Sequence, residues 1–338
     1  MRYLKKFETL EEYDDYRASA EFVKPNVSQI GVEVKFTGID PPLYVEAIED
    51  LTVSFSTNAI QYSLDKANWV DLPAATATPT IRAGQKVYFK ASGLTATSSA
   101  GIGTFSMTAP CNVGGNIMSM SHGDDYVNAT EITQSYQFQS LFANAANIVS
   151  AENLVLPATT LTDYCYKSLF YKCTSLIKSF SVLPASIAPT WAYAVMFRDC
   201  SNLQDAPEIL ATSIRDYGCK LMFADCKKLV KAPSALYAKS PGRSYESMFY
   251  DCYILEVAPV IYAETLPSYC CSQMFGYCYK LSYIKAMFIT APGTNYTNIW
   301  VSGVPAGGTF VKNAVATWEN SFGTSAIPSG WTVELADA

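Results

Sequence analysis

The sequence predicts a multi-domain, β-rich protein with four parts: a short N-terminal anchoring segment, a small β-sandwich, a solenoid, and a C-terminal cap. Two observations predict it. A Phe-x-x-Cys-x-x-Leu pattern recurs every 26 to 28 residues, which indicates stacked repeats. Charged residues make up only 16% of the 338 residues and tyrosine is abundant, which favours β-rich or repeat architecture over a helical bundle.

Residues 1–35 are predicted to form a separate anchoring segment. The Thr9-x-x-Glu12 pattern is typical of a capping box at a helix start, and FVKPNVSQI is expected to be extended around Pro25. No apolar signal segment and no run of 18 apolar residues occur. We therefore expect no membrane span and synthesis in a reducing cytoplasm. The apolar residues expected to hold a partner are Tyr3, Leu4, Phe7, Tyr13, Phe22 and Val23.

Residues 36–112 are predicted to form an antiparallel sandwich of immunoglobulin-like type. Apolar residues alternate in LTVSF (51–55), KVYFK (86–90) and FSM (105–107). Trp69 is the one large candidate for a core anchor. Residues 113–139 are predicted to connect the sandwich to the repeats, with a hinge at Gly114-Gly115.

A phenylalanine anchors each repeat. MFRDCSNLQDAP begins at Met196, and two similar stretches follow at intervals of 26 residues. Ala-Pro marks the end of a short strand in these units, and apolar residues three or four apart before the Phe predict a short helix. No single unit can bury its own Phe, Cys and Leu, so stacked units must bury them as columns. The anchors, within repeats spanning 140–290, are Phe142, Phe170, Phe197, Phe223, Phe249 and Phe275.

Eight of the ten cysteines fall in or beside two repeated positions that also accept Ala, Gly or Ser. Selection for small volume favours buried free thiols. Disulfides between neighbouring coils and a metal site are the alternatives, but no Cys-x-x-Cys pair is present. We therefore expect no metal and no cofactor.

The repeated motif, roughly M-F-x-x-C-x-x-L-x-x-A-P-x-L, resembles the BspA-like leucine-rich repeats of gut Bacteroidales and their phages. Six copies occur over 140–290, and the first has Ala145 in place of Cys, as expected of a terminal coil. The resemblance implies a right-handed solenoid of leucine-rich-repeat type. It also implies that residues 291–338, with Trp300 and Trp331, form the cap of the array.

Charge and residue types argue against two function classes. The net charge of −6 and a pI near 5 leave no basic stripe for nucleic acid. The single histidine, His122 in SHGDDY, could act as a base or a metal ligand with Asp124 and Asp125, but a polar loop between domains is favoured. Without another histidine or a convergent acid pair, we expect a protein that is not an enzyme.

Three sets of repeated residues are candidates for binding. Asp199, Asp225 and Asp251 form a column that could bind calcium or serve as solvated turn residues, and the turn role is favoured. Tyrosines crowd the last coils, where they serve either a partner or packing. The residue type two positions after the repeated Leu varies from repeat to repeat. Such variation is expected of a recognition face, or of an exposed sheet whose sequence varies without selection. These positions, here called the recognition column, are Lys178, Asp205, Lys231, Val257 and Tyr283.

The N-terminal segment resembles the leaders of virion proteins, and the chain as a whole resembles head-fibre and decoration proteins of crAss-like phages. This implies a virion structural protein that is assembled in the host cytoplasm and attaches to capsid or tail proteins through its N-terminus. Its solenoid would bind a host surface glycan or protein, and its oligomer would be a homotrimer. The alternative is a bacterial cell-surface adhesin of the BspA-like type.

Overall fold

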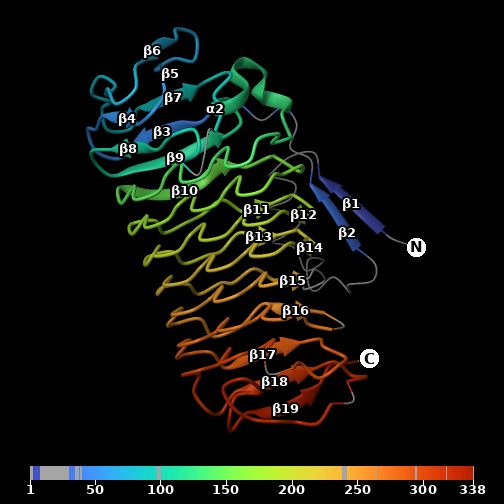
Figure 1. Cartoon of the computed structure of the whole chain (residues 1–338). Helices are drawn as coiled ribbons and strands as arrows, with labels where there is room; N and C mark the ends of the chain where they lie inside the picture. The colour runs from blue at the N-terminus through green and yellow to red at the C-terminus, as the bar shows by residue number, and fades with distance from the viewer. Residues whose placement is uncertain are drawn as a thin grey trace.

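The computed structural model describes residues 3–7, 30–34, 38, 40–96, 100–237, 242–263, 265–293, 295–316 and 318–337. Over these residues the chain is β-rich, as predicted, and it contains almost no helix. The molecule is elongated, with a sheet domain at one end and a stack of coils running to the other (Figure 1). No helix among the described residues is long and apolar enough to cross a membrane.

The N-terminal segment contributes a two-stranded parallel sheet. Strands β1 (Tyr3–Phe7) and β2 (Ile30–Val34) pair along their full length, with Tyr3 opposite Ile30. The expected helix after Thr9 lies outside the described residues.

The sheet domain is built from two sheets. The smaller pairs β4 (Val53–Phe55) with β8 (Phe105–Met107), antiparallel. The larger has the order β10-β9-β3-β7-β5-β6 and is antiparallel except for the parallel β9–β10 pair. Its strands are β3 (Tyr44–Ala47), β5 (Ile60–Ser63), β6 (Val70–Leu72), β7 (Lys86–Lys90), β9 (Cys111–Asn116) and β10 (Ile148–Val155).

Trp69 is not the core anchor of this domain, so that prediction is wrong. Its side chain is half-buried, and its indole N–H donates to the Lys66 carbonyl at 3.1 Å. The core is filled by three fully buried phenylalanines, Phe55, Phe89 and Phe105, whose rings pack 4.8 to 5.0 Å apart. A tight polar loop holds Trp69 at the rim instead.

Gly114 and Gly115 do not form a hinge. They lie inside β9, paired with Asn153 and Leu154 of β10, and both are buried. A Cβ on Gly114 would meet the Tyr44 ring, and one on Gly115 would meet the Pro42 carbonyl. Both positions therefore require glycine because other atoms approach closely, and β9–β10 pairing makes the junction part of one sheet.

Two short helical elements follow β9. They are α2 (Ser119–His122) and η2 (Gly123–Asn128). They cover one edge of the sheet domain before the chain enters the coils (Figure 1).

A β-solenoid of about six turns occupies residues 182–335. Its strands pair parallel from coil to coil, since every coil runs in the same direction. The strands are β11 (Val182–Leu183), β12 (Ile187–Ala188), β13 (Glu208–Ile209), β14 (Ser213–Ile214), β15 (Ala235–Tyr237), β16 (Val260–Tyr262), β17 (Tyr283–Ala286), β18 (Thr309–Lys312) and β19 (Thr332–Leu335).

The coils continue past residue 290, where the sequence motif stops. Strand β18 pairs with β17, and β19 pairs with β18, so the expected cap is a continuation of the stack. Three tryptophans tie these last coils together by donating their indole N–H to a carbonyl 26 or 30 residues away. The pairs are Trp300 with Ala326, Trp331 with Pro305, and Trp318 with Phe288, at 2.7 to 3.2 Å.

The short helix expected in each repeat is replaced by a ribbon of turns. In residues 164–173 alternate backbone N–H groups take two different partners. Those of Tyr166, Ser168 and Phe170 donate to the next coil. Those of Lys167 and Leu169 donate three residues back in the same coil. An α-helix satisfies its own backbone, but this ribbon takes half of its hydrogen bonds from a neighbour. Stacking is therefore needed to complete each coil.

Every fourth residue of the ribbon has a positive φ. In one coil Tyr164, Ser168 and Lys172 have φ of 62°, 57° and 60°, and the next two coils repeat the pattern. Asn and Asp adopt this left-handed conformation more readily than most residues. That preference explains why the repeat places Asp225 and its counterparts where it does, at φ near 63°.

The predicted interior columns are confirmed. All six anchor phenylalanines are fully buried, and neighbouring rings stack with centroids 5.1 to 5.7 Å apart. The stack reaches Phe105 of the sheet domain at 5.7 Å and Trp300 of the last coils at 5.9 Å. One continuous hydrophobic core therefore runs the length of the molecule.

Candidate functional site

The structure aligns the first three members of the recognition column on an exposed line and pairs the last two, of which Tyr283 is half-buried. Parallel backbone β-bridges between neighbouring coils join Lys178 to Asp205 and Asp205 to Lys231. Another joins Val257 to Tyr283. The repeat places them one strand spacing apart, about 4.8 Å. A recognition role for this column stays a prediction.

The column combines charge with apolar surface. Lys178 is 54% exposed and pairs with Glu152 at 3.1 Å, while Asp205 and Lys231 are exposed beside it. Val257 is 53% exposed. Exposed ion pairs of this kind contribute little to stability, about 0–1 kcal/mol. The alternating positive and negative charges along the column therefore shape the surface but add little to the stability of the fold.

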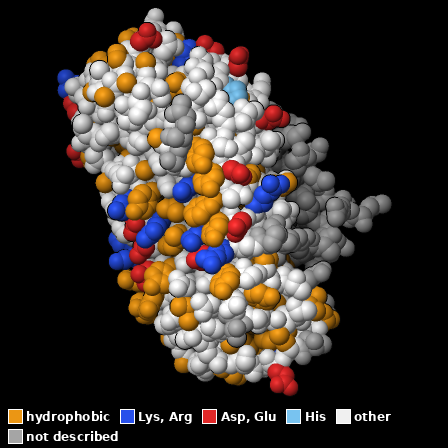
Figure 2. All heavy atoms as spheres, in the orientation of Figure 1, with side chains coloured by type: hydrophobic (Ala, Val, Ile, Leu, Met, Phe, Trp, Pro, Cys, Tyr) orange, Lys and Arg blue, Asp and Glu red, His pale blue; other side chains and the backbone are white. Residues whose placement is uncertain are grey.

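Apolar side chains flank the column on the outside of the coils. Ile177, Val230 and Ile254 are 36%, 59% and 39% exposed. Charged and apolar side chains are interspersed over the middle coils on the face shown in Figure 2. Mixed apolar and charged surface on a rigid frame is typical of binding faces of repeat proteins.

The tyrosines of the last coils form a second exposed group. Tyr277 and Tyr279 are 37% and 49% exposed, and Tyr250 and Tyr253 pack against them with ring centroids 5.2 to 5.4 Å apart. A Cβ on Gly276 would lie 2.9 Å from the Tyr250 ring, so glycine lets that ring lie against the next coil. The rings are thus held in fixed positions by packing against one another. Packing is one of the two roles expected for these tyrosines.

A stacked aromatic column on the opposite end of the turn ribbon carries no comparable open surface. Tyr136, Tyr164, Trp191 and Tyr217 stack with interplanar angles of 6° to 20°, and all are half-buried. Lys167 lies 4.9 Å from the Trp191 ring centroid. One position per repeat is thus mostly aromatic, and its rings stack because they occupy the same place in successive coils with the same positive φ.

The aspartate column is a column of turn residues. Asp199, Asp225 and Asp251 all have positive φ, and Arg198 lies 3.8 Å from the first two carboxylates. Burial, followed by the neighbouring carboxylates Asp199 and Asp251, raises the pKa of Asp225 above its usual range. The described residues contain no group of three His, Cys, Asp or Glu side chains arranged to hold a metal ion.

Replacing Asp225 with Asn is expected to stabilise the protein at neutral pH by roughly 0.2–1 kcal/mol, as like charges on facing positions are destabilising. Because the folded-state pKa of Asp225 is raised, its charge penalises the folded state at high pH, and protonation removes the penalty as pH falls. The gain should therefore shrink between neutral pH and about pH 4. Urea unfolding of both proteins across that range measures it, and an unchanged or growing gain at low pH would contradict the assignment.

The thiols are buried and free, as favoured by the sequence. All ten cysteines are buried and unpaired, and burial raises the pKa of Cys165 to about 12. The repeated cysteines also do more than fill space. Each donates its S–H to the carbonyl of the phenylalanine one coil earlier, for example Cys226 to Phe197 at 3.1 Å. Both properties make the column structural rather than reactive.

Within the described residues, His122 makes no hydrogen bond or ion pair with Asp124 or Asp125. It ends α2 and bonds through Nδ1 to the Ser121 hydroxyl at 2.8 Å. The Asp124 carboxylate instead pairs with Lys90 at 2.6 Å, and Lys90 Nζ also lies 4.4 Å from the Trp69 ring centroid. The SHGDDY stretch thus serves to attach α2 to the sheet domain.

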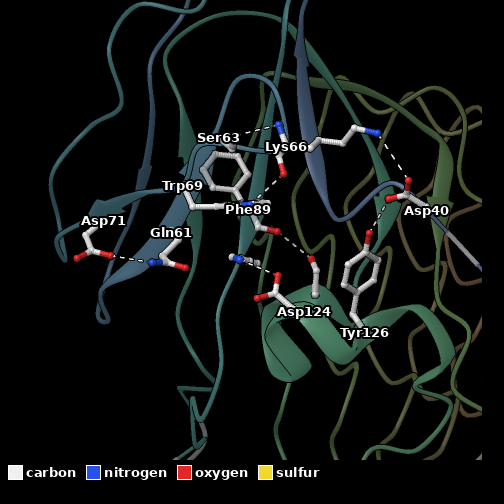
Figure 3. A network of polar contacts seen from close by, with 11 residues as sticks. Asp40, Gln61, Ser63, Lys66, Trp69, Asp71, Phe89, Asp124 and Tyr126 are labelled. Atoms are coloured by element: carbon white, nitrogen blue, oxygen red, sulfur yellow. Dashed lines mark hydrogen bonds and ion pairs between the residues drawn. The ribbon is translucent and has the colours of Figure 1, made fainter.

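A polar network surrounds this attachment (Figure 3). Tyr126 donates its hydroxyl to Asp40 at 2.6 Å, and Asp40 also pairs with Lys66 at 3.6 Å. Burial and the hydrogen bond to Asp40 raise the pKa of Tyr126 well above its usual range. The groups are paired with one another, so the network is structural.

The structure places only part of the predicted anchoring set. Tyr3, Leu4 and Phe7 lie on β1. Tyr13, Phe22 and Val23 lie outside the described residues. The anchoring role of all six stays a prediction.

Comparison with known proteins adds no relative. No family model matches the chain, and neither the curated proteins nor the solved structures include a match. The function must therefore be inferred from the residues and their geometry.

Proposed function

We propose that this protein is a non-enzymatic adhesion protein whose rigid solenoid presents the recognition column to a surface glycan or protein. The observation that carries the proposal is the register of Lys178, Asp205 and Lys231, side by side and exposed on a fixed frame. Such a frame costs little ordering entropy on binding, because its core is one continuous stack.

The proposal includes a place in the virion, as a head fibre or a decoration protein of the capsid or tail. Its support is the resemblance of residues 1–35 to virion-protein leaders and of the repeats to the BspA-like type. In this proposal the coils are of right-handed leucine-rich-repeat type, residues 36–112 are immunoglobulin-like, and the protein is a homotrimer. The second candidate is a bacterial cell-surface adhesin, supported by the same repeat motif.

Charge reversal in the recognition column tests the binding function. Lys178→Glu with Lys231→Glu is expected to weaken binding to bacterial cells and to a polysaccharide array at least about tenfold, or 1.4 kcal/mol. Both lysines are exposed, so the cost to stability should be limited to the new like-charge contacts with Glu152 and Asp205, about 0.2–1 kcal/mol for each pair. The matched control is Lys66→Glu with Arg82→Glu, which changes the charge equally on the exposed surface of the sheet domain.

If both double variants lose the same binding affinity, the cause is a general effect of charge. The recognition column is then not the binding site. Location is tested separately, by mass spectrometry of gradient-purified particles and of washed cell envelopes from the same culture. Peptides of this chain in the envelopes alone would favour the cell-surface adhesin.

A further inference from the structure

A hollow of about 500 Å³ opens at a corner of the coils, away from the recognition column. Its lining comes from four successive coils and lies around the ends of β12 and β14, whose positions Figure 1 shows. Its volume falls within the range of small-molecule sites, about 300–1,000 Å³. The lining residues of this corner hollow are Ser135, Thr159, Thr160, Leu161, Thr162, Asp163, Ser186, Ile187, Pro189 and Arg215.

Hydroxyl groups dominate the lining, and most of them have no protein partner. Thr162 donates to the Gln134 carbonyl at 2.7 Å. Over the described residues, the hydroxyls of the other four serines and threonines make no hydrogen bond. They are therefore available both to donate to and to accept from a polyhydroxylated ligand.

The hollow contains two charged side chains of opposite sign, Asp163 and Arg215. Asp163 already accepts a hydrogen bond from the backbone N–H of Thr190 at 3.0 Å. Arg215 is exposed, and within the described part of the chain its guanidinium has neither an ion pair nor a hydrogen bond. A guanidinium is suited to bidentate pairing with a carboxylate. The guanidinium thus offers a pairing partner to an acidic ligand, and the Asp163 carboxylate offers an acceptor to the hydroxyl groups of that ligand.

Apolar side chains complete the lining. Ile187 is 46% exposed at the hollow, and Pro189 is buried in its wall. Apolar surface beside convergent polar groups is typical of ligand sites, where it packs against the carbon skeleton of the ligand. A sugar ring presents both kinds of surface.

We propose that the corner hollow binds an acidic saccharide, with Arg215 pairing to a uronate carboxylate. The free hydroxyls of Thr160 and Ser186 exchange hydrogen bonds with the sugar, and Ile187 packs against its ring. This inference rests on the proposed function as an adhesion protein, and it adds a second site with a defined ligand class.

The test is calorimetric titration of the full chain with a galacturonic acid hexamer and with its neutral methyl ester. We expect the acid to bind and its ester to bind at least tenfold more weakly. Arg215→Gln should weaken binding of the acid at least tenfold. The matched control, Lys228→Gln, removes one exposed positive charge elsewhere on the coils and should change the affinity less than twofold. Thermal unfolding of each variant confirms that it is folded.

Each result has a separate meaning. If the acid binds Arg215→Gln as tightly as the unchanged protein, the hollow is not the site, although saccharide binding and the proposed function stand. If acid and ester bind equally, the acidic specificity is wrong. If the hexamer does not bind while cells or array glycans still bind through the recognition column, the second site alone is wrong. If neither binds, the proposed function fails as well.

Discussion

Replacing Phe223 with Ala is expected to cost about 3–5 kcal/mol of unfolding free energy. Phe223 is fully buried and stacks on Phe197 and Phe249 at 5.5 Å on each side. Its removal leaves a cavity between two rings that the backbone holds at the coil spacing, so neighbours cannot close it. Urea unfolding followed by near-ultraviolet circular dichroism measures the loss.

Two companion variants separate the causes. Phe223→Leu keeps most of the apolar volume but loses two ring pairs, each worth roughly 0.5–1.5 kcal/mol, so an intermediate loss is expected. Lys231→Ala, on the exposed side of the same coil, should change stability by less than about 0.5 kcal/mol. Similar losses for Phe223→Ala and Lys231→Ala would show that the assignment of interior and exterior positions is wrong.

The interior of the solenoid was predictable because one periodicity fixes it. A column such as Phe197, Phe223 and Phe249 follows from spacing alone, since equal steps along the chain return to the same place in each coil. The same reasoning put Lys178, Asp205 and Lys231 in one line. In a repeat protein, residues separated by one repeat length are predicted to be in contact. An isolated motif allows no such prediction.

The turn ribbon was not predictable from the apolar pattern, because apolar residues three or four apart fit a short helix equally well. The distinguishing signal was conformational. Asn144, Asp199 and Asp225 occupy one position of the repeat, and Asn and Asp are the residues that best tolerate its positive φ. Calcium binding was the alternative interpretation of the aspartate carboxylates, and the turn role that the sequence favoured agrees with their backbone conformation.

The corner hollow could not be predicted from the sequence, because its residues are not part of the repeated motif. Thr160, Ser186 and Arg215 belong to different coils and occupy no shared position of the motif. The 26 residues between Thr160 and Ser186 match the repeat step, but both positions lie outside the repeated Phe, Cys and Leu pattern, and the spacing of Arg215 does not match. Sites formed at a corner between coils can be found only once the path of the chain is known.

The junction between sheet domain and coils provides the last test, since a Gly-Gly pair there favoured a hinge. Gly115→Ala is expected to destabilise the protein strongly. Its φ of 80° costs an alanine about 1–3 kcal/mol on its own. The new Cβ would also meet the Pro42 carbonyl, which is backbone and cannot turn aside. The expected loss therefore exceeds the conformational cost alone, and thermal and urea unfolding should both report it.

Gly84→Ala is the matched control, because Gly84 has a φ of 81° and open space around its Cβ position. Subtracting its loss from that of Gly115→Ala removes the conformational cost and leaves the effect of close packing at the junction. A true hinge would make the two losses equal, and the sheet domain would then unfold separately from the coils. A larger loss for Gly115→Ala in a single transition is expected instead, because β9 and β10 join both parts in one sheet and Phe105 stacks on Phe142 across the junction.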